Sequence, residues 1–381
     1  MKITVLGEFL LDESTGISGA QVQNYNLASA FAGHRLDVHY IALTKNKDIG
    51  SRIVNKIKVH PVRHENLLFH WFLEIYFLMK VLNRINPDVI YQRGRSYLTY
   101  AAAKWARKKK KKFIWGSNGE DSCDFWKQIK RLHHSQRPFW KKIILFPHMA
   151  IQDIFVHKGI REAHVHINQT NHQRSRLQKN YGKQGIIIPS YFIAPSDKQR
   201  YDKEKIVLWL ANLGQNKQPE LFLRLAENCI EFNGWKFILG GGTKKTEYFR
   251  HLCQQAQNLP NVEILGYVPF NKTDELYARA SLFVNTSLRE ADGLPNSFIQ
   301  AWLNNTPVLS LYHDPNNWIS SRNLGICAYG DNDKFFKIGM ALINDKEKLQ
   351  RMGERCVRFA RETFCDEKII DTYLDIFNGK L

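Results

Sequence analysis

The chain has 381 residues, of which 44% are hydrophobic and 24% charged, a balance that excludes a disordered chain and allows two domains of ordinary size. Its six cysteines lie far apart and form no C-x-x-C pair, which argues against a zinc site and a disulfide scaffold and favours a reducing compartment. The net charge of +19 indicates an acidic partner.

The first half alternates short apolar strands with helical stretches, which predicts a parallel sheet covered by helices on both faces. Residues 1–7 are typical of a strand rather than of a secretory signal peptide. The expected strands are 3–6, 38–41, 89–91, 113–115, 164–167 and 185–189, and the expected helices include 21–31 and 99–108.

The most apolar stretch, residues 67–82, is interrupted by His70, Glu74 and Lys80 and falls short of the ~18–20 uncharged apolar residues of a spanning helix. It predicts either a core helix or an interfacial one.

A polar segment that contains Pro195, residues 190–205, is typical of a linker, after which the strand–helix pattern starts again. The expected elements of the second half are strands 206–210, 236–239, 262–265, 282–285 and 308–311 with helices 219–231 and 346–364. We therefore predict an α/β fold of two doubly wound, Rossmann-like domains, residues 1–195 and 196–365, with residues 366–381 crossing back to the first. Such domains bind ligands at the carboxyl ends of their strands.

The positive charge is confined to the first half. Residues 1–200 hold 33 Lys and Arg against 14 Asp and Glu, whereas residues 201–381 hold 22 of each. A one-sided basic domain indicates anionic lipid, nucleic acid or an anionic substrate, the alternative being a surface tuned for solubility. The Lys108–Lys112 run ends a helix and no aromatic RNA-binding motif is present, so we expect no nucleic-acid partner.

Two loops at strand ends are suited to phosphate. Gly16–Ala20 precedes a helix, so the amides of Ser18, Gly19 and Ala20 can approach a diphosphate, although a plain turn explains the glycines equally well. In the loop 212–219, Lys217 is placed to put a positive charge on phosphate, just before a helix opened by Pro219.

Two further segments follow strands of the second half. Gly240–Gly242 allows a nucleotide to approach the backbone. The segment 288–302 has acidic residues and a glycine before a helix, a combination that suits sugar hydroxyls and phosphate; the acidic residues also suit a helix N-terminus alone. No Walker motif or G-x-S-x-G elbow is present, and the clustered histidines such as His164 and His166 fit satisfied core positions.

With these segments the chain resembles glycosyltransferase family 4, the retaining enzymes of the GT-B fold. The resemblance covers nearly the whole chain, is strongest over residues 206–330, and rests on residues 16–23, 91–94, 212–219, 265–268, 292–302 and 305–308. It implies that the glycine loop and Lys217 hold the donor diphosphate, that the segment with Tyr267 and Val268 lies beside the base, and that two glutamates eight positions apart hold the donor sugar and the ribose.

The chain departs from the family pattern at that glutamate pair. One register places the pair at Asp292 and Gln300, and the other at Glu290 and Phe298. We favour the first, because the Pro-Asn and Ala-Trp neighbours then match the family. Asn212 stands where many relatives have arginine, and the acceptor-side histidine is missing after residue 115.

The expected site follows from this resemblance. Asp292 and Lys217 are the catalytic candidates. The donor-binding candidates are Ser18, Gly19, Ala20, Asn212, Gly214, Gly241, Tyr267, Val268, Gly293, Leu294 and Gln300, and the acceptor-side candidates are Arg93, Asn118 and Asp121.

The sequence thus predicts a cytoplasmic glycosyltransferase that uses a nucleotide-sugar donor, needs no metal or other cofactor, and acts on a glycan or lipid-linked acceptor at an anionic membrane surface. Residues 104–112 and 127–142, with Trp126, Phe139 and Trp140, are the expected membrane contacts, while Arg93 and Arg95 are alternatives for an anionic acceptor. A degenerate relative that binds without turnover is the main competing hypothesis.

Overall fold

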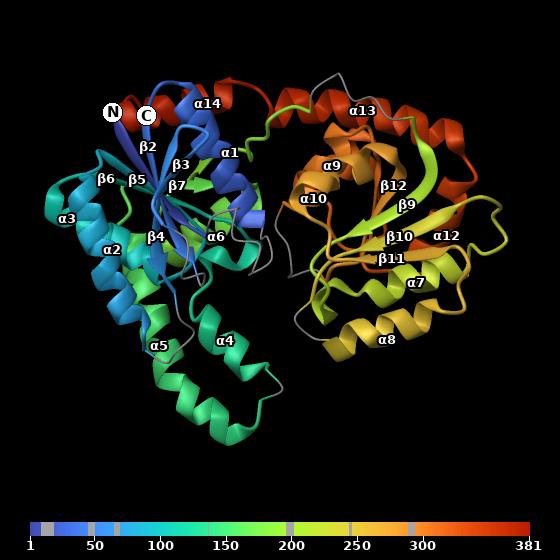
Figure 1. The fold of residues 1–381 in the computed structure, drawn as a ribbon, viewed down its shortest axis with the longest axis horizontal. Coiled ribbons are helices and arrows are strands. Elements are labelled where there is room, and N and C mark those ends of the chain that lie inside the picture. Colours follow the sequence, from blue (N-terminus) through green and yellow to red (C-terminus); the bar gives the residue numbers. More distant parts are fainter. Residues whose placement is uncertain are drawn as a thin grey trace. The chain divides into compact units, whose positions relative to one another are not determined.

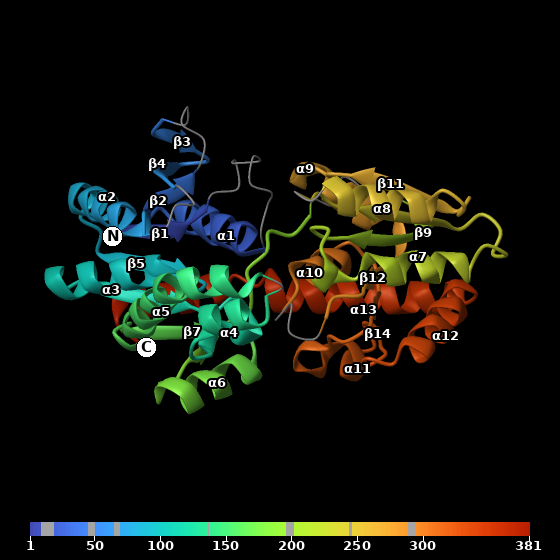
Figure 2. The same cartoon turned by 90° about the horizontal axis from the view of Figure 1, so that it is seen from below.

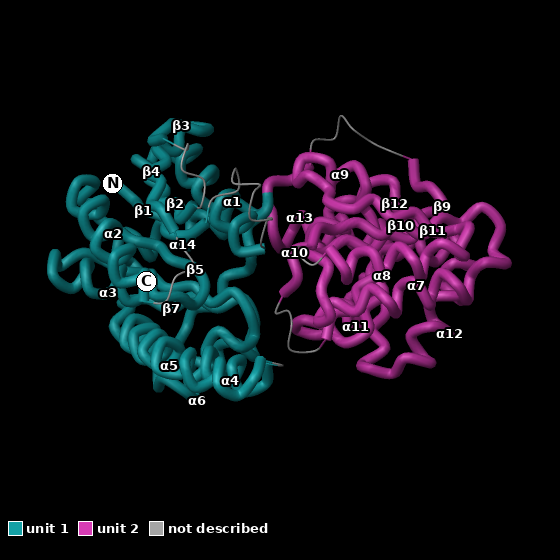
Figure 3. Tube along the Cα trace, turned by 60° about the horizontal axis from the view of Figure 1, so that its bottom comes forward, with its two compact units in different colours: residues 1–192, 366–381 teal, residues 193–365 magenta. Residues whose placement is uncertain are grey.

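The computed structural model describes residues 1–8, 19–44, 50–64, 69–135, 137–195, 202–243, 246–288 and 294–381. The chain divides into two compact units, residues 1–192 together with 366–381, and residues 193–365 (Figure 3). Each unit contains one largely parallel sheet with helices packed on it (Figure 1). The predicted α/β class with two parallel-sheet domains is confirmed.

The sheet of the first unit has the strand order β3-β4-β2-β1-β5-β6-β7-β8. Neighbouring strands are parallel, apart from the antiparallel pair β3 and β4. The strands are β1 (Lys2–Gly7), β2 (Asp37–Thr44), β3 (Arg52–Val54), β4 (Ile57–Arg63), β5 (Val89–Arg93), β6 (Lys112–Gly116), β7 (Val165–Asn168) and β8 (Ile186–Ile187).

Alternation along these strands builds two apolar layers. Val5 and Tyr91 pack on one face with α1 and α14, and Leu6 and Ile90 pack on the other with α2, α3 and α5. The helices are α1 (Gly19–Gly33), α2 (Trp71–Ile85), α3 (Tyr97–Lys109), α4 (Lys127–His133), α5 (Phe139–Arg161), α6 (Asn171–Tyr181) and α14 (Lys368–Asn378), with the 3₁₀ turn η2 (Glu120–Cys123). In Figure 1, α4 and the first half of α5 project beyond the sheet of this unit.

Local signals set the ends of several of these helices. The Ser96 hydroxyl accepts the N–H of Leu98 at the start of α3, and Thr170 caps α6 in the same way. Gly182, with φ of 63°, ends α6 in the left-handed conformation that favours glycine.

The sheet of the second unit has the order β11-β10-β9-β12-β13-β14 and is parallel throughout its described strands. The strands are β9 (Glu204–Leu210), β10 (Lys236–Gly240), β11 (Val262–Gly266), β12 (Ala280–Asn285), β13 (Val308–Ser310) and β14 (Gly325–Cys327). Val207 and Trp209 face a core that includes Phe222 of α7 and Phe335 of α12.

The helices of the second unit are α7 (Pro219–Glu227), α8 (Thr246–Ala256), α9 (Phe270–Arg279), α10 (Asn296–Leu303), α11 (Trp318–Arg322), α12 (Asn332–Ile343) and α13 (Lys346–Phe364), with the 3₁₀ turns η3 (Gln215–Lys217) and η4 (Pro315–Asn317). The long helix α13 runs across this unit in both views (Figures 1 and 2). Asp345 begins it by accepting the N–H of Lys348.

The structure adds elements that the sequence did not predict and shortens others. The strands β3, β4 and β14 were not predicted, and the helix expected over 219–231 ends at Glu227. The apolar stretch 67–82 contributes to α2, where Leu78 and Leu82 are buried. In the part of the chain that the structure describes, no helix is both long and apolar enough to span a bilayer.

Candidate functional site

Backbone hydrogen bonds join the loops at the carboxyl ends of the second sheet. The N–H of Leu213, after β9, donates to the carbonyl of Gly242 at 2.9 Å, and the N–H of Gly241 donates to that of Gly266 at 2.7 Å. The N–H of Leu288, after β12, donates to Asn216 at 2.9 Å. The loops that hold four groups of predicted donor-binding residues therefore form one connected edge.

The backbone of Lys217 is fixed on both sides. Its N–H donates to the carbonyl of Gly214 at 2.8 Å, and its carbonyl accepts the hydroxyl of Thr286 at 2.7 Å. That hydroxyl accepts the indole N–H of Trp209 at 2.9 Å. The Lys217 side chain is half-buried directly before Pro219 opens α7, and Asn212 is exposed in the same loop.

The loop after β10, which contains Gly240–Gly242, needs glycine for steric reasons. A Cβ on Gly241 would lie 1.8 Å from the carbonyl oxygen of Ala211, so the two backbones touch there. A Cβ on Gly242 would lie 3.1 Å from the ring of Tyr267, and one on Gly240 would lie 3.0 Å from Val268. The Tyr267 side chain is 45% exposed, which leaves ring area for a ligand beside a close-packed backbone.

The segment after β12 is described only in part, because Glu290, Asp292 and Gly293 lie outside the described residues. Leu294 is buried, and the Gln300 amide on α10 donates to the Thr273 hydroxyl on α9 at 3.4 Å. Thr273 follows Val268 by five positions in the chain, so this hydrogen bond joins α10 to the helix that comes after the predicted base-binding segment.

The alternative partner Phe298 is fully buried. Its ring packs 6.4 Å from that of Phe283 and 5.8 Å from that of Trp302. A side chain in this position contributes to the core and has no surface for a ribose.

In the first unit, Gly19 and Ala20 open α1, whereas Ser18 lies outside the described residues. The acceptor-side candidates follow β5 and β6. Asn118 is exposed, and its amide oxygen accepts the Ser122 hydroxyl at 2.8 Å.

Asp121 binds the ammonium group of Lys127 at 2.6 Å, which connects the turn η2 to the start of α4. Burial lowers the pKa of Lys127, and the Asp121 carboxylate opposes this shift.

Arg93 is 6% exposed at the end of β5, and one guanidinium nitrogen lies 3.4 Å from the hydroxyl of Tyr91. Within the described segments of the chain, its Nε and Nη2 have no hydrogen-bond partner. Arg93 therefore lies under the surface at this edge of the first sheet rather than on it.

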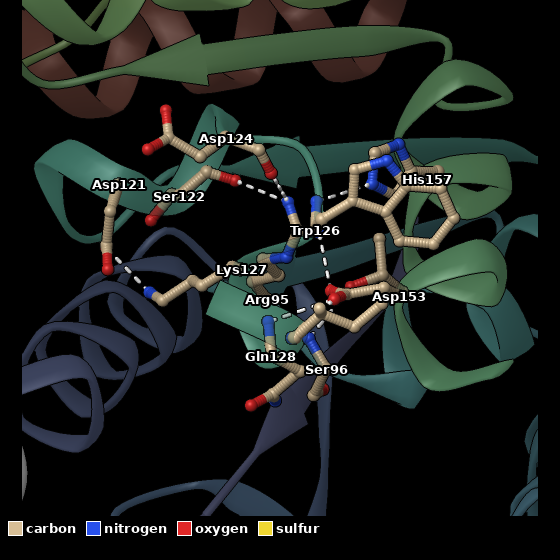
Figure 4. A network of polar contacts seen from close by, with 12 residues as sticks. Arg95, Ser96, Asp121, Ser122, Asp124, Trp126, Lys127, Gln128, Asp153 and His157 are labelled. Atoms are coloured by element: carbon tan, nitrogen blue, oxygen red, sulfur yellow. Dashed lines mark hydrogen bonds and ion pairs between the residues drawn. The ribbon is translucent and has the colours of Figure 1, made fainter. Parts of the chain in front are cut away.

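The alternative that Arg95 faces an anionic acceptor is wrong, because this side chain is part of a buried network (Figure 4). Its Nη2 binds Asp153 at 2.9 Å, and the two side chains are 3% and 0% exposed. Its Nη1 donates to the carbonyl of Asp124 and, at 3.2 Å, to the hydroxyl of Tyr181. Arg95 instead connects α5 and α6 to the segment before α4.

Two lysines of the predicted membrane contact are also engaged within the protein. Lys111 pairs with Asp88 at 2.8 Å, and Lys112 donates to the carbonyls of Ile376 and Phe377 at the end of α14. Lys112 thereby holds the C-terminal helix on the first unit.

The sequence analysis missed a buried polar network in the first unit. The Gln23 amide of α1 donates to the Ser190 hydroxyl at 2.7 Å and accepts from Gln169 at 3.3 Å. Gln173 accepts the Ser117 hydroxyl at 2.7 Å. Glutamines beside strand ends were the only sign of this network in the sequence. They did not indicate its partners, because hydrogen-bonded residues such as Gln23 and Ser190 are 167 positions apart. The network fixes the start of α1 against the strand ends.

Metal-ligating side chains do not gather in the described residues. No group of three or more His, Cys, Asp or Glu there is arranged to hold a metal ion. His166, one of the clustered histidines, instead makes a 2.7 Å contact with the carbonyl of Ile160 and is a satisfied core residue.

Two family models match the chain. Residues 193–356 match the model described as glycosyl transferases group 1, and residues 18–144 match the one described as glycosyl transferase 4-like. A stretch of 139 residues is 26% identical to an uncharacterized glycosyltransferase of Methanocaldococcus jannaschii. That match covers 34% of this chain and 35% of the relative, about a third of its length.

Solved structures match over essentially the whole chain. HepE of Anabaena, in complex with UDP and glucose, has a TM-score of 0.71 at 15% identity, with 100% of both chains covered. Sucrose-phosphate synthase of Thermosynechococcus elongatus has a TM-score of 0.76 at 13% identity, covering 100% of this chain and 99% of that one. WaaG, a glycosyltransferase involved in lipopolysaccharide biosynthesis, has a TM-score of 0.70 at 14% identity, with 100% of both covered.

The two models together span more than half of the chain, and both units have the architecture of the matched structures. The chain belongs to the glycosyltransferases of the GT-B fold.

Proposed function

We propose that this glycosyltransferase moves a sugar from a nucleotide-sugar donor to a glycan or lipid-linked acceptor, as a step of bacterial cell-surface polysaccharide synthesis. The observation that carries the proposal is the connected edge of the second sheet, where the loops of Lys217, Gly241 and Tyr267 are hydrogen-bonded to one another or in contact. The UDP and glucose in the HepE complex support this choice of donor.

Each group at this edge has a role in the proposal. Lys217 and the amides near Gly214 and Gly241 bind the donor diphosphate. For the first unit, the family resemblance assigns phosphate contacts to the amides of residues 18–20. Tyr267 and Val268 lie against the base, where the ring of Tyr267 offers a stacking surface. Asn212, Gly293 and Leu294 complete the donor contacts, and Arg93, Asn118 and Asp121 belong to the acceptor side.

The reaction breaks the bond between the anomeric carbon and the diphosphate oxygen and forms a bond from that carbon to an acceptor hydroxyl oxygen. The acceptor proton leaves with the nucleoside diphosphate. Negative charge grows on the leaving oxygen in the transition state, and a fixed ammonium group and backbone amides stabilise it there. Because Lys217 and the amides supply this positive charge, the proposed mechanism needs no metal. Retention of configuration is the expectation from the family resemblance.

Substitution of Lys217 tests the donor site. We expect Lys217→Ala to weaken UDP binding by roughly 1.5–3 kcal/mol, the range for a hydrogen bond to a charged group, with calorimetry as the assay. Lys236→Ala is the matched control, since Lys236 is exposed at the opposite, amino end of β10. Equal UDP affinity of the Lys217 variant and the control would remove Lys217 from the site.

We further propose the register that pairs Asp292 with Gln300. The full burial of Phe298 supports it, because the competing register needs that ring to bind a ribose. Gln300 can still hydrogen-bond ribose hydroxyls without charge. We expect Asp292→Ala to abolish transfer and Gln300→Glu to keep or raise donor affinity. Loss of transfer in Glu290→Ala but not in Asp292→Ala would favour the other register.

A membrane surface is the proposed working location, at the cytoplasmic face. The projecting α4–α5 region exposes Phe139 by 77% and Trp140 by 58%, among basic residues such as Lys130, Arg131 and Lys141. Aromatic side chains insert at the headgroup level, and each nearby basic residue is worth about 1 kcal/mol on an anionic surface.

Vesicle co-sedimentation at low and high salt tests this location. We expect binding to anionic vesicles that weakens with salt and with Phe139→Ser plus Trp140→Ser. Ile53→Ser is the control, because Ile53 is 72% exposed on β3, away from this region. Equal binding to neutral and anionic vesicles, or none to either, refutes the proposal.

A binding protein without turnover is the second candidate, favoured by Gln300 and Asn212 where the family has charged residues. Release of UDP from UDP-sugars in the presence of acceptor distinguishes the two. Stabilisation by nucleotide sugars without release would identify the binding protein.

A further inference from the structure

A groove of 610 Å³ opens on the first unit beside α4, α5 and α6. Its lining includes the rings of Trp126, His157 and Tyr181 and the cationic groups of Lys158, Arg161 and Lys183. None of these residues is among the predicted donor-binding or acceptor-side groups. The groove is therefore separate from the residues predicted to bind the donor or the acceptor.

The aromatic wall of the groove is held in place from behind. Trp126 has a backbone φ of 56°, a conformation that costs of order 1–3 kcal/mol for a bulky residue and persists only where its surroundings impose it. Its N–H donates to the His157 Nε2 at 3.4 Å, and the His157 ring stacks on Phe125 at 4.4 Å. Nε2 accepts a hydrogen bond here and so carries no proton, and burial lowers the pKa of His157 to about 4, so the imidazole is neutral at pH 7.

The buried Arg95–Asp153 pair anchors this wall. Arg95 donates to the hydroxyl of Tyr181, and Asp153 accepts the N–H of Ile129. Asp153 also accepts the N–H of Gln128, two residues after Trp126 (Figure 4). The indole of Trp126 remains 43% exposed. A strained and partly exposed tryptophan on a rigid support is a preorganised contact surface rather than a packing residue.

The cationic side of the groove lacks carboxylate partners. Lys158 and Arg161 are exposed one turn apart on α5, and no ion pair found among the described residues involves them or Lys183. The carboxylate of the lining, Glu162, binds Arg107 at 2.9 Å. The groove is therefore positive beside a flat aromatic surface.

These features select a ligand with two properties, an apolar ring face and a negative charge. The C–H face of a pyranose packs on an indole, and a carboxylate or phosphate on the same sugar pairs with lysine and arginine. The groove also adjoins the acceptor-side segment, because Lys127, next to Trp126, binds Asp121. We propose that it is a subsite for an acidic sugar unit of the acceptor, an inference that rests on the proposed transfer function.

Calorimetry on the full chain at low salt tests the subsite. The anionic probes are a hyaluronan tetrasaccharide, which carries glucuronate, and glucose 6-phosphate, and the neutral probe is chitotetraose. We expect at least one anionic probe to bind about tenfold or more tightly than the neutral one, and this preference to decline with salt.

Charge reversal at the groove separates it from general electrostatic attraction. We expect Lys158→Glu with Arg161→Glu to weaken binding of the anionic probe about tenfold or more. Arg52→Glu with Lys56→Glu is the matched control, since both residues are exposed near β3 and the charge change is the same. We expect that control to stay within about twofold of the unaltered chain, and UDP affinity to stay unchanged in both variants.

Equal loss in the two double variants, or no binding of either anionic probe to the unaltered chain, would overturn the subsite. A second result would also overturn the subsite: the chain binds phosphatidylglycerol vesicles, this binding depends on Lys158 and Arg161, and neither anionic sugar binds. That result would identify a lipid headgroup as the ligand instead. Failure of UDP to bind, with normal binding of an anionic sugar, would refute the proposed transfer and leave a glycan-binding groove.

Discussion

The buried ion pair between Arg95 and Asp153 is the contact whose loss we expect to cost the first unit most. Both side chains are nearly inaccessible, at 3% and 0% exposure, and their charged atoms lie 2.9 Å apart. Asp153→Asn keeps the shape but removes the charge, and an amide nitrogen then faces either Arg95 or the N–H groups of Gln128 and Ile129. An unpaired guanidinium remains buried, which predicts a loss of about 3–5 kcal/mol in the free energy of unfolding.

Urea unfolding of the full chain, followed by tryptophan fluorescence and circular dichroism, measures this loss. Asp37→Asn is the matched control, because Asp37 pairs with Lys58 at 2.8 Å with side chains 37% and 48% exposed. Because the Asp37–Lys58 pair is exposed, we expect the control to lose less than about 1 kcal/mol in the free energy of unfolding.

The double variant Arg95→Met with Asp153→Leu extends the test. Removing both charges leaves no buried ion, so it should recover much of the stability lost in Asp153→Asn. A loss below about 1 kcal/mol in Asp153→Asn, or a double variant no better than the sum of its single changes, would refute the assignment of this pair as the anchor of α4.

Three other predictions concern stability at or near the described contacts. Lys203→Met should destabilise the second unit by about 1–3 kcal/mol in thermal unfolding, because the part-buried Lys203 ammonium donates to three carbonyls and a hydroxyl that would lose this donor; a loss near zero would contradict this. Burial lowers the pKa of His157 to about 4, below that of the unfolded chain, so the folded state resists protonation and stability should fall as the pH drops from about 6.5 towards 4. This decline should be smaller in His157→Phe, and an identical pH profile would exclude His157 as its source. Gly241→Ala should prevent normal folding of the second unit, because the new Cβ would lie 1.8 Å from a backbone oxygen. Gly182→Ala has nothing within 4 Å of the new Cβ and should cost only the strain of its positive φ. Circular dichroism and unfolding curves measure both effects.

The strands β1 and β5 were predicted because their apolar character is nearly continuous. Neighbouring residues such as Val5 and Leu6 enter opposite cores, so most positions of residues 3–6 and 89–91 are apolar and the run is visible in the sequence. The strand β4, which lies between β2 and the edge strand β3, was missed because Lys58 and Arg63 are exposed on it and Pro61 lies within it. Only Ile57–Val59 pair with β3, so one side of β4 is open at Pro61, as it is along an edge strand. Edge strands tolerate proline and charge, which removes the sequence signal.

The same contrast applies to the site. Lys217 and Gly241 could be placed at one edge of the second sheet because each lies in a loop that follows a strand, and parallel strands bring their carboxyl ends to one edge; their roles there stay predictions. Arg95 was misassigned because its partner Asp153 is 58 positions away, and no local pattern indicates that contact. The groove beside α5 was missed for a related reason, since its wall is assembled from the segment before α4 and from two helices.

The position of α14 has a consequence for the order of events during synthesis. Phe31 and Tyr91 of the first unit pack against Tyr373 of this helix, and Lys112 binds its last carbonyls. The ribosome makes α14 only after the whole second unit, residues 193–365. The first unit, although translated first, therefore waits with one apolar face uncovered while the second completes its own core. A nascent chain of this kind is exposed to aggregation and to chaperones in proportion to the time needed to translate those intervening residues.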